Sequence, residues 1–421
     1  MIDRAACTPA PQWLQDWRAQ QLQTFLQQGF PGRRDENWKY TSIAPLLEKT
    51  FSLADSANDS LEPDISAHRM PESYYLVFID GVWRPEYSEW DGLPKTVLLT
   101  DCAEAVIRYP DRYQQAITAC APSNLSSFYS LNGALNRDGL FLAIPDHVEL
   151  TKPIHVCYLT TGDAVMHHPR HLIHLGAHSA VSLLEEYTGV DRRCYFNNIV
   201  THISVSANAR LNYYKLQAES THAFHIAHTI IDQAGDSQVR TGHIAIGSRL
   251  NRDDLQFGLQ QPGASCELAG FYYPQSHQHL DFHTRIDHQS SRTRSRQYYK
   301  GIIAGEGRAV FNGKIVAHSQ VKQVIAQQVN HNLLLSKSAE VDTKPELEVF
   351  ADDVQCTHGA TVGYLDDSAL FYLRSRGIPE RLAQQILMNG FAQEVFDRFP
   401  DPAIAEYVQQ KIRREEQYVS E

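Results

Sequence analysis

The residues best suited to chemistry lie in one segment towards the C-terminal end of the chain, 351–361. Cys356 and His358 are two positions apart in it. In an extended strand every second side chain points to the same face, so the thiol and the imidazole would lie about 7 Å apart along the strand. Both groups are ligands for iron or zinc. Two ligands are half of a tetrahedral site, so the spacing alone favours a buried cysteine beside a hydrogen-bonded histidine unless a partner surface supplies the rest.

The chain contains 20 histidines, which raises the question of a second metal site. Candidate groups are His277, His279 and His283, and His167, His168, His171, His174 and His178. His277 and His279 can share one face of a strand, but such a pair supplies only two ligands, and there is no HExxH motif. We interpret these residues as surface or ladder histidines.

The sequence lacks the signatures of nucleotide chemistry. Gly313-Lys314 is followed by Ile315, and Arg308 stands where a Walker A loop has its first glycine. The segment 305–307, Gly-Glu-Gly, lacks the third glycine of a dinucleotide fingerprint and follows no βαβ pattern. We therefore expect a tight turn at 305–307 and no ATP bound by this chain.

Composition narrows the class of protein. The 421 residues include 38 Lys and Arg against 49 Asp and Glu, a formal net charge of -11. The chain thus lacks the excess of positive charge that is typical of proteins that bind nucleic acid. The N-terminal segment is polar and Gln-rich, and no apolar run of about 18 residues occurs, so we expect a cytoplasmic protein with no membrane span. The seven cysteines form no CxxC pair, and we expect most of them to be small buried hydrophobic residues.

β-Strands, which the sequence predicts from period-two patterns, would position Cys356 and His358. Alternating apolar and polar residues at 180–186, 210–216 and 238–246 predict strands, and strand patterns dominate from 140 to 365. Turn-forming clusters recur at 176–177, 207–209, 234–236 and 262–264, about 27 to 31 residues apart. A fixed period with only β pattern inside it predicts a β-solenoid, whose coils bury their faces by stacking. Regular corners alone leave an antiparallel sandwich as the alternative.

Helical patterns flank this β region. Apolar spacing between Pro11 and Gly29 predicts an amphipathic helix. In the tail, Asp367-Ser368 can cap a helix that stops at Gly377, Pro379 opens another, and a last helix starts at Pro402. We predict four regions: an N-terminal helical region 1–70, a mixed α/β lead-in 71–139, a β core 140–365 and a C-terminal helical region 366–421.

Several segments together resemble the SufB/SufD family of iron-sulfur cluster assembly proteins. They are Glu-Asn-Trp-Lys-Tyr-Thr at 36–41, and the segments 307–313, 339–349, 351–363 and 371–378. The resemblance spans nearly the whole chain and is densest from 307 to 390. It implies a mainly β fold, a right-handed parallel β-helix flanked by N-terminal and C-terminal helical regions.

The resemblance also implies a function. A member of this family is a non-catalytic scaffold that forms a heterodimer with its SufB paralogue, and each of the two binds one copy of the ATPase SufC. A nascent, transient iron-sulfur cluster forms at the SufB interface, where His358 would be the main ligand and Cys356 a lesser candidate. The C-terminal region would dock the ATPase through Phe371, Tyr372, Leu373, Arg374, Arg376, Gly377 and Ile378.

One departure separates the two branches of the family. SufB-like sequences have a cysteine in the segment that here reads Ser-Ala-Glu-Val-Asp-Thr, 338–343. A sulfur-accepting step needs a thiolate, so this chain is not expected to accept sulfur, and the SufD branch is favoured. The resemblance says nothing about a flavin and leaves open a homodimer of the isolated chain.

Two functions of another class are alternatives to the scaffold: a stand-alone β-helix metalloenzyme, and a carbohydrate-active enzyme with a carboxylate-rich cleft. The second kind is usually secreted, and the N-terminal segment has no signal-peptide pattern. Turnover by the isolated chain distinguishes both enzymes from a scaffold.

Overall fold

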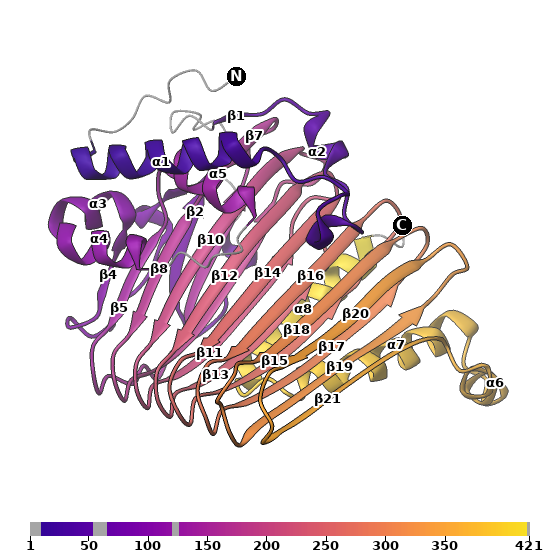
Figure 1. Ribbon diagram of the computed structural model, residues 1–421. Helices are drawn as coiled ribbons and strands as arrows, with labels where there is room; N and C mark the ends of the chain where they lie inside the picture. Colours follow the sequence, from indigo (N-terminus) through magenta and orange to yellow (C-terminus); the bar gives the residue numbers. More distant parts are fainter. Residues whose placement is uncertain (1–9, 54–64, 120–125, 419–421) are drawn as a thin grey trace.

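The protein, seen here as a computed structural model that describes residues 10–53, 65–119 and 126–418, is built around two facing β-sheets (Figure 1). The first sheet contains, in spatial order, β20 (Glu340–Val349), β18 (Arg308–Ala317), β16 (His279–His288), β14 (Leu250–Leu259), β12 (Phe224–Gln233), β10 (Tyr195–Val205), β8 (Arg170–Leu175), β5 (Leu140–Ile144) and β4 (Leu98–Asp101), with β7 (Val165–His167) and β1 (Ser52–Leu53) beside this row. The second sheet contains β21 (Val354–Tyr364), β19 (Val324–Leu334), β17 (Arg294–Ile303), β15 (Ser265–Tyr272), β13 (Gln238–Ala245), β11 (Arg210–Ala218), β9 (Ala180–Gly189), β6 (Ile154–Thr160), β2 (Tyr74–Ile79) and β3 (Val82–Trp83).

Successive strands of the body alternate between the two sheets, and each pairs in parallel with the strand one coil further on. Tyr213 of β11, for example, is in register with Thr241 of β13, which is in register with Leu268 of β15. This arrangement confirms the predicted parallel β-solenoid and excludes the antiparallel sandwich. The parallel pairing also reaches back to β2, which pairs with β6.

The predicted turn clusters lie at the corners of the coils. His178, Asn208 and Asp236 have positive φ values of 58°, 59° and 55°, and Gly263 has 79°. Asn, Asp and Gly tolerate this left-handed conformation better than most residues, which explains why such residues recur with the coil period. The corners also bond to one another: the backbone N–H of Asn208 donates to the carbonyl of Gly235 on the next coil at 3.0 Å.

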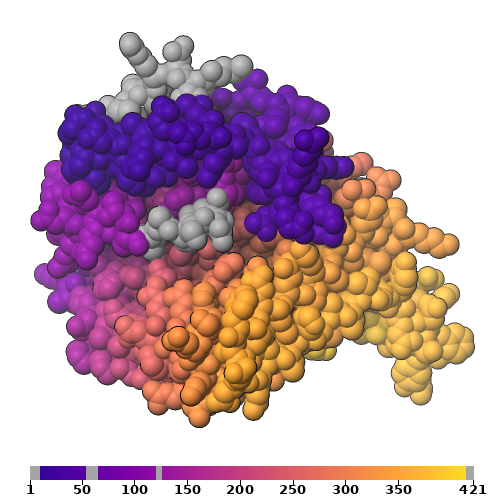
Figure 2. Space-filling model, viewed as in Figure 1, coloured from indigo at the N-terminus to yellow at the C-terminus, as the bar shows by residue number. Residues whose placement is uncertain are grey.

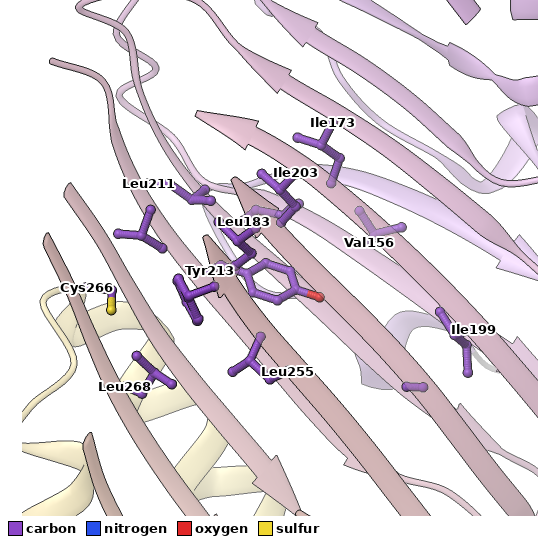
Figure 3. Close-up of a cluster of buried hydrophobic side chains, with 14 of the residues drawn as sticks. Val156, Ile173, Leu183, Ile199, Ile203, Leu211, Tyr213, Leu255, Cys266 and Leu268 are labelled. Atoms are coloured by element: carbon purple, nitrogen blue, oxygen red, sulfur yellow. The ribbon is translucent and has the colours of Figure 1, made fainter. Parts of the chain in front are cut away.

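Inward-pointing side chains from both sheets form a continuous core. Figure 3 shows part of it, with Leu183, Leu211 and Tyr213 of the second sheet facing Ile203 and Leu255 of the first. All of these side chains are buried. Full burial of each large apolar side chain stabilises the fold by about 1.5–3 kcal/mol, so stacking of many coils is what makes the solenoid stable.

Helices cover the outer faces of both sheets (Figure 1). On the N-terminal side these are α1 (Gln12–Gln28), α2 (Ala44–Leu47), α3 (Cys102–Arg108), α4 (Pro110–Thr118), α5 (Ser127–Leu135) and the 3-10 turns η1 (Glu36–Trp38), η2 (Ile65–His68) and η3 (Pro85–Tyr87). On the C-terminal side they are α6 (Asp367–Ser375), α7 (Glu380–Phe396) and α8 (Pro402–Tyr418). The predicted helices after Pro11, Pro379 and Pro402 are therefore confirmed. The division of the chain at residues 70, 139 and 365 stays a prediction.

The two terminal groups of helices dock on different sheets. α1 and α5 pack together, and their cluster joins Phe128 to Phe196 and Phe224 of the first sheet. α7 and α8 pack on the second sheet, where Val395, Ile404 and Val408 join Leu216 and Ile244. In the part of the chain that the structure describes, no helix has the length and apolar character that a membrane crossing requires.

Candidate functional site

The two ends of the solenoid are built differently. At the beginning of the solenoid, short antiparallel strands close the sheets: β3 pairs with β2, and β4 pairs with β5. At the other end β20 and β21 are the outermost strands of their sheets, and among the described residues no strand pairs with their outer edges. Figure 2 shows this last coil, in orange, facing outwards. Long open edges invite pairing with another chain, so natural proteins normally keep them short or cover them.

The last coil also exposes large apolar side chains. Phe350 and Tyr364 are each 64% exposed, and Val349 and Val362 are more than two-fifths exposed. The register partners of Val349 and Val362 on the preceding coil, Ala317 and Asn332, are buried, whereas Val349 and Val362 have no further coil of the described residues to cover them. The open end therefore combines unpaired backbone groups with uncovered apolar surface, as expected of a subunit interface.

Pro345 lies in the middle of β20 and fits its edge position. The N–H groups of Glu340 and Phe350 donate to the carbonyls of Gly307 and Ala317, on the side of β20 that pairs with β18. Along a strand, successive N–H groups point alternately towards one neighbouring strand and towards the other side. The nitrogen of Pro345 therefore faces the open side, where its missing N–H costs the solenoid no hydrogen bond.

Cys356 and His358 lie on β21 at this open end. Their register partners on β19 are Ala326 and Gln328, which are buried, whereas Gln327 between them is exposed. The same alternation turns Cys356 and His358 towards the solenoid interior. Cys356 is half-buried, but His358 is exposed because no further coil of the described chain covers it. The structure thus brings the two side chains to one strand face at the mouth of the interior.

The two potential ligands are not equivalent. Burial raises the pKa of the Cys356 thiol, so this thiol holds its proton more firmly than a free cysteine and is a weaker metal ligand. The part of the chain that the structure describes contains no group of three or more His, Cys, Asp or Glu arranged to hold a metal ion. A metal at Cys356 and His358 would therefore need ligands from another molecule.

A polar network that sequence reasoning missed lies just inside the open end. The Tyr272 hydroxyl donates to Asn332 Oδ1 at 2.6 Å, and Asn330 Nδ2 donates to the Tyr272 hydroxyl at 2.9 Å. Thr343 of β20 donates to Asn330 Oδ1 at 2.8 Å, so the network joins both sheets of the last coils. The signal in the sequence is the pair Asn330 and Asn332, polar residues at the inward positions of a strand. This network gives the mouth of the interior a rigid polar lining.

Within the described residues, the remaining histidines and cysteines do not gather into a second site. His277 lies at an exposed corner with a φ of 69°, whereas His279 is on β16 with Nε2 2.9 Å from Thr41 Oγ1. In the other group, His167, His168 and His171 are buried, so these three are not surface histidines; the ladder alternative remains for His167 on β7 and His171 on β8. Cys102, Cys157 and Cys266 are buried, as expected; Cys194 is half-buried, and Cys7 and Cys120 lie outside the described residues.

The predicted ATPase-docking residues lie on and after α6, which projects from the body (Figure 1). Phe371 is 74% exposed and Tyr372 57% exposed, while Leu373 and Ile378 are half-buried. The helix is capped by Asp366, one residue before the predicted cap, and Gly377 follows it with a φ of 84°. α6 itself buries none of its residues, so its aromatic side chains are free to contact a partner.

The aromatic N-terminal motif at 36–41 is a structural anchor. Trp38 is buried and stacks on the guanidinium of Arg252 at 4.4 Å, and Arg252 Nη1 donates to the Asn37 carbonyl at 2.7 Å. Thr41 donates to Asp281, and Lys344 on the edge strand β20 lies 2.8 Å from Glu36. The motif thereby joins the N-terminal helices to the coils nearest the open end.

A groove lies elsewhere, between the N-terminal segment and one row of corners. It has a volume of about 1100 Å³, and its lining includes Arg33, Arg249 and Arg308 but neither Cys356 nor His358. The groove and the Cys356–His358 pair are therefore separate places on the molecule: the pair lies at the open end of the solenoid and not in a cavity.

Comparison with known proteins finds sequence matches along most of the chain. The family model described as "SUF system FeS cluster assembly, SufBD core domain" matches residues 158–391, and the "SufBD protein N-terminal region" matches residues 3–156. An iron-sulfur cluster assembly SufBD family protein of Synechocystis sp. is 32% identical over 88% of this chain and 84% of its own length. The iron-sulfur cluster assembly protein SufD of Escherichia coli is 31% identical over 93% of this chain and 91% of its own length. The chain therefore belongs to the SufB/SufD family of iron-sulfur cluster assembly proteins.

Proposed function

We propose that this protein is a non-catalytic, SufD-type scaffold subunit that pairs through its open solenoid end with a SufB-type paralogue. The observation that carries the proposal is the last coil: two long unpaired edge strands, exposed apolar side chains, and an inward Cys-x-His pair at the same place. A partner of the same fold, with its own open end, can extend both sheets and cover these groups at once.

The nascent iron-sulfur cluster forms in this interface as cargo. His358 supplies a neutral imidazole nitrogen, and Cys356 is a secondary ligand because burial raises the pKa of its thiol. The partner supplies the remaining ligands, including a cysteine of the SufB-type chain. This division explains why this chain alone offers only half of a tetrahedral site.

Sulfur enters through the partner rather than through this chain. The segment 338–343, which carries a cysteine in SufB-like sequences, has none here, and three of the described cysteines are buried. Attack on a sulfur donor requires an accessible thiolate. The scaffold therefore contributes a ligand and a surface, and the chemistry of sulfur transfer belongs to the SufB-type subunit.

The ATPase SufC docks on the C-terminal helices. Phe371 and Tyr372 on α6, and Leu382 and Ile386 on α7, leave much of their apolar surface exposed. Exposed aromatic side chains on a projecting helix are typical interface anchors. ATP hydrolysis belongs to SufC, and its movement reaches the interface through α7, which packs on β15 and β17.

The test is co-purification with SufB-type and SufC-type partners, followed by anaerobic iron and sulfide analysis. We expect His358→Ala to lose most of the iron while the complex still assembles, because an exposed histidine contributes little to the core. Cys356→Ser should lose less. The matched control is His331→Ala, one coil inside and on the outward face, where Nδ1 lies 2.6 Å from Thr361 Oγ1. Normal iron in His358→Ala would refute the ligand assignment.

A further inference from the structure

A buried side chain lies next to the candidate ligand His358, one coil further into the solenoid. Gln328 of β19 is 1% exposed and is the register partner of His358. Its Nε2 donates to the Gly313 carbonyl at 3.1 Å, whereas its Oε1 is buried without a hydrogen-bond partner among the described residues. An unpaired buried amide oxygen costs free energy, so the arrangement calls for a donor.

The contact with Gly313 fixes which way the amide points. Were the amide turned over, Oε1 would face the Gly313 carbonyl oxygen, and two acceptors repel each other. A Cβ at position 313 would lie 2.1 Å from Gln328 Nε2, so the glycine provides the room for this contact. Gln328 therefore presents an acceptor, and only a donor can satisfy it.

His358 is the donor in reach. Gln297, Gln328 and His358 occupy successive positions of one inward column, and in-register neighbours of a parallel sheet are about 4.8 Å apart. Gln297, on the inner side, directs its Nε2 to Thr284 instead. On the outer side, water can serve the His358 N–H while the end is open. A covering partner removes that water, and the His358 ring N–H and Gln328 Oε1 can then satisfy each other by a hydrogen bond.

We propose that Gln328 is the positioning residue for His358. Its Oε1 accepts a hydrogen bond from one ring N–H of His358 when the partner covers the open end. That bond selects one tautomer and leaves the lone pair of the second ring nitrogen directed at iron, as carbonyl groups do for metal-binding histidines elsewhere. This inference rests on the proposed function of the open end.

The experiment compares Gln328→Met with Gln297→Met in the complete complex with both partners. The two glutamines are matched: each is buried, each donates from Nε2 inside the core, and each has an Oε1 with no partner among the described residues, but only Gln328 of the two neighbours His358. We measure iron retained against a chelator after anaerobic loading. Gln328→Met should lose iron 10-fold or more faster, on the scale of roughly 10- to 100-fold for such supporting residues. Gln297→Met should behave as the unmodified complex.

A second readout separates positioning from general support. Pulsed EPR of the reduced cluster, with ¹⁵N-labelled histidine as reference, reports the hydrogen bond of the remote ring nitrogen. That signal should shift in Gln328→Met and stay unchanged in Gln297→Met. If Gln328→Met reduces the yield of folded complex, Gln328→Asn, which keeps an amide but withdraws it from His358, carries the same expectation.

The outcomes are distinct. Unchanged iron retention and an unchanged nitrogen signal in Gln328→Met, with iron lost in His358→Ala, overturn this inference and leave the proposed function standing. Equal effects of Gln328→Met and Gln297→Met also overturn it, because they indicate only a structural role. Normal iron in His358→Ala overturns both proposals.

Discussion

At the scale of single residues, Arg252 is the clearest case of one side chain joining distant parts of the chain. Its guanidinium, 2% exposed, forms ion pairs at 2.8 Å with Asp254 and with Asp281 and stacks on Trp38. Burial opposes the charge of Asp281, but Arg252 and His283 hold the pKa of this carboxyl below its usual range. Removing one member of such a buried ion pair is costly, because the remaining carboxylate is left buried without a compensating charge or water.

We therefore expect Arg252→Ala to lower the free energy of unfolding by about 3–5 kcal/mol. The matched control is Arg285→Ala, which removes a similar two-contact pair with Asp287 at 2.6 and 2.8 Å from a partly exposed site. That variant should cost no more than about 1 kcal/mol, because water replaces the lost contacts. Guanidinium unfolding curves measure both. Equal losses in the two variants would contradict the role given to Arg252.

At the scale of elements, the C-terminal helices divide into a packed part and a projecting part. α8 is held on the solenoid by the buried Glu186, whose carboxylate accepts from Tyr407 at 2.5 Å and from Lys411 at 2.8 Å. Burial disfavours this charge, yet hydrogen bonds from His155 and His68 keep the pKa of Glu186 well below its usual range. α6 has no comparable anchor, so its aromatic side chains are available to a partner.

This difference predicts what a charge on α6 does. Phe371→Asp should weaken binding of the SufC-type ATPase by about 2 kcal/mol or more, roughly 30-fold, because it removes an aromatic anchor from the contact. Calorimetric titration of the ATPase into the purified chain measures the change.

The control for that experiment is Ile107→Asp on α3, where the side chain is 78% exposed on the N-terminal side of the molecule. It should leave ATPase affinity unchanged, and both variants should unfold at the same denaturant concentration as the unmodified chain. Unaltered ATPase affinity in Phe371→Asp would remove α6 from the docking surface.

At the scale of the whole molecule, the solenoid buries many neutral histidines. Burial lowers the pKa to about 3 for His168 and His171 and to about 4 for His167, His228 and His288. Their unfolded-state value is about 6.5. Between pH 6.5 and 4 the unfolded chain therefore binds protons that the folded chain refuses, and stability falls as pH falls.

Two buried carboxyls act in the opposite direction. Burial raises the pKa of Glu185 and of Asp138 to about 7, so the folded chain takes up their protons first and gains stability as pH falls from 7. The five histidines outweigh these two groups. The net loss between pH 7 and pH 5.5 is on the order of 3 kcal/mol.

We expect the guanidinium midpoint to be lower at pH 5.5 than at pH 7. His171→Gln should reduce this pH dependence by about 1 kcal/mol, because it removes one of the buried groups. His222→Gln, at an exposed corner, should leave the dependence unchanged. A midpoint that rises towards pH 5.5 would show that the buried carboxyls dominate instead.

Much of this protein follows from local patterns in its sequence. Period-two alternation predicts strands because successive side chains of a pleated strand point to opposite faces of the sheet. Turn residues spaced by one coil, such as Asn208 and Asp236, predict a solenoid because left-handed corners favour those types. The same-face placement of Cys356 and His358 is equally local, and so is the missing nucleotide loop.

Only the tertiary structure decided which parts are covered. Nothing local distinguishes β21 from β19, yet the absence of a further coil makes His358 exposed while its register partner Gln328 is buried. The contact between Trp38 and Arg252 joins residues more than 200 positions apart. The burial of His171 likewise depends on strands from several coils. Burial, ion pairing and open edges depend on neighbours distant in the chain, and no short segment of sequence contains that information.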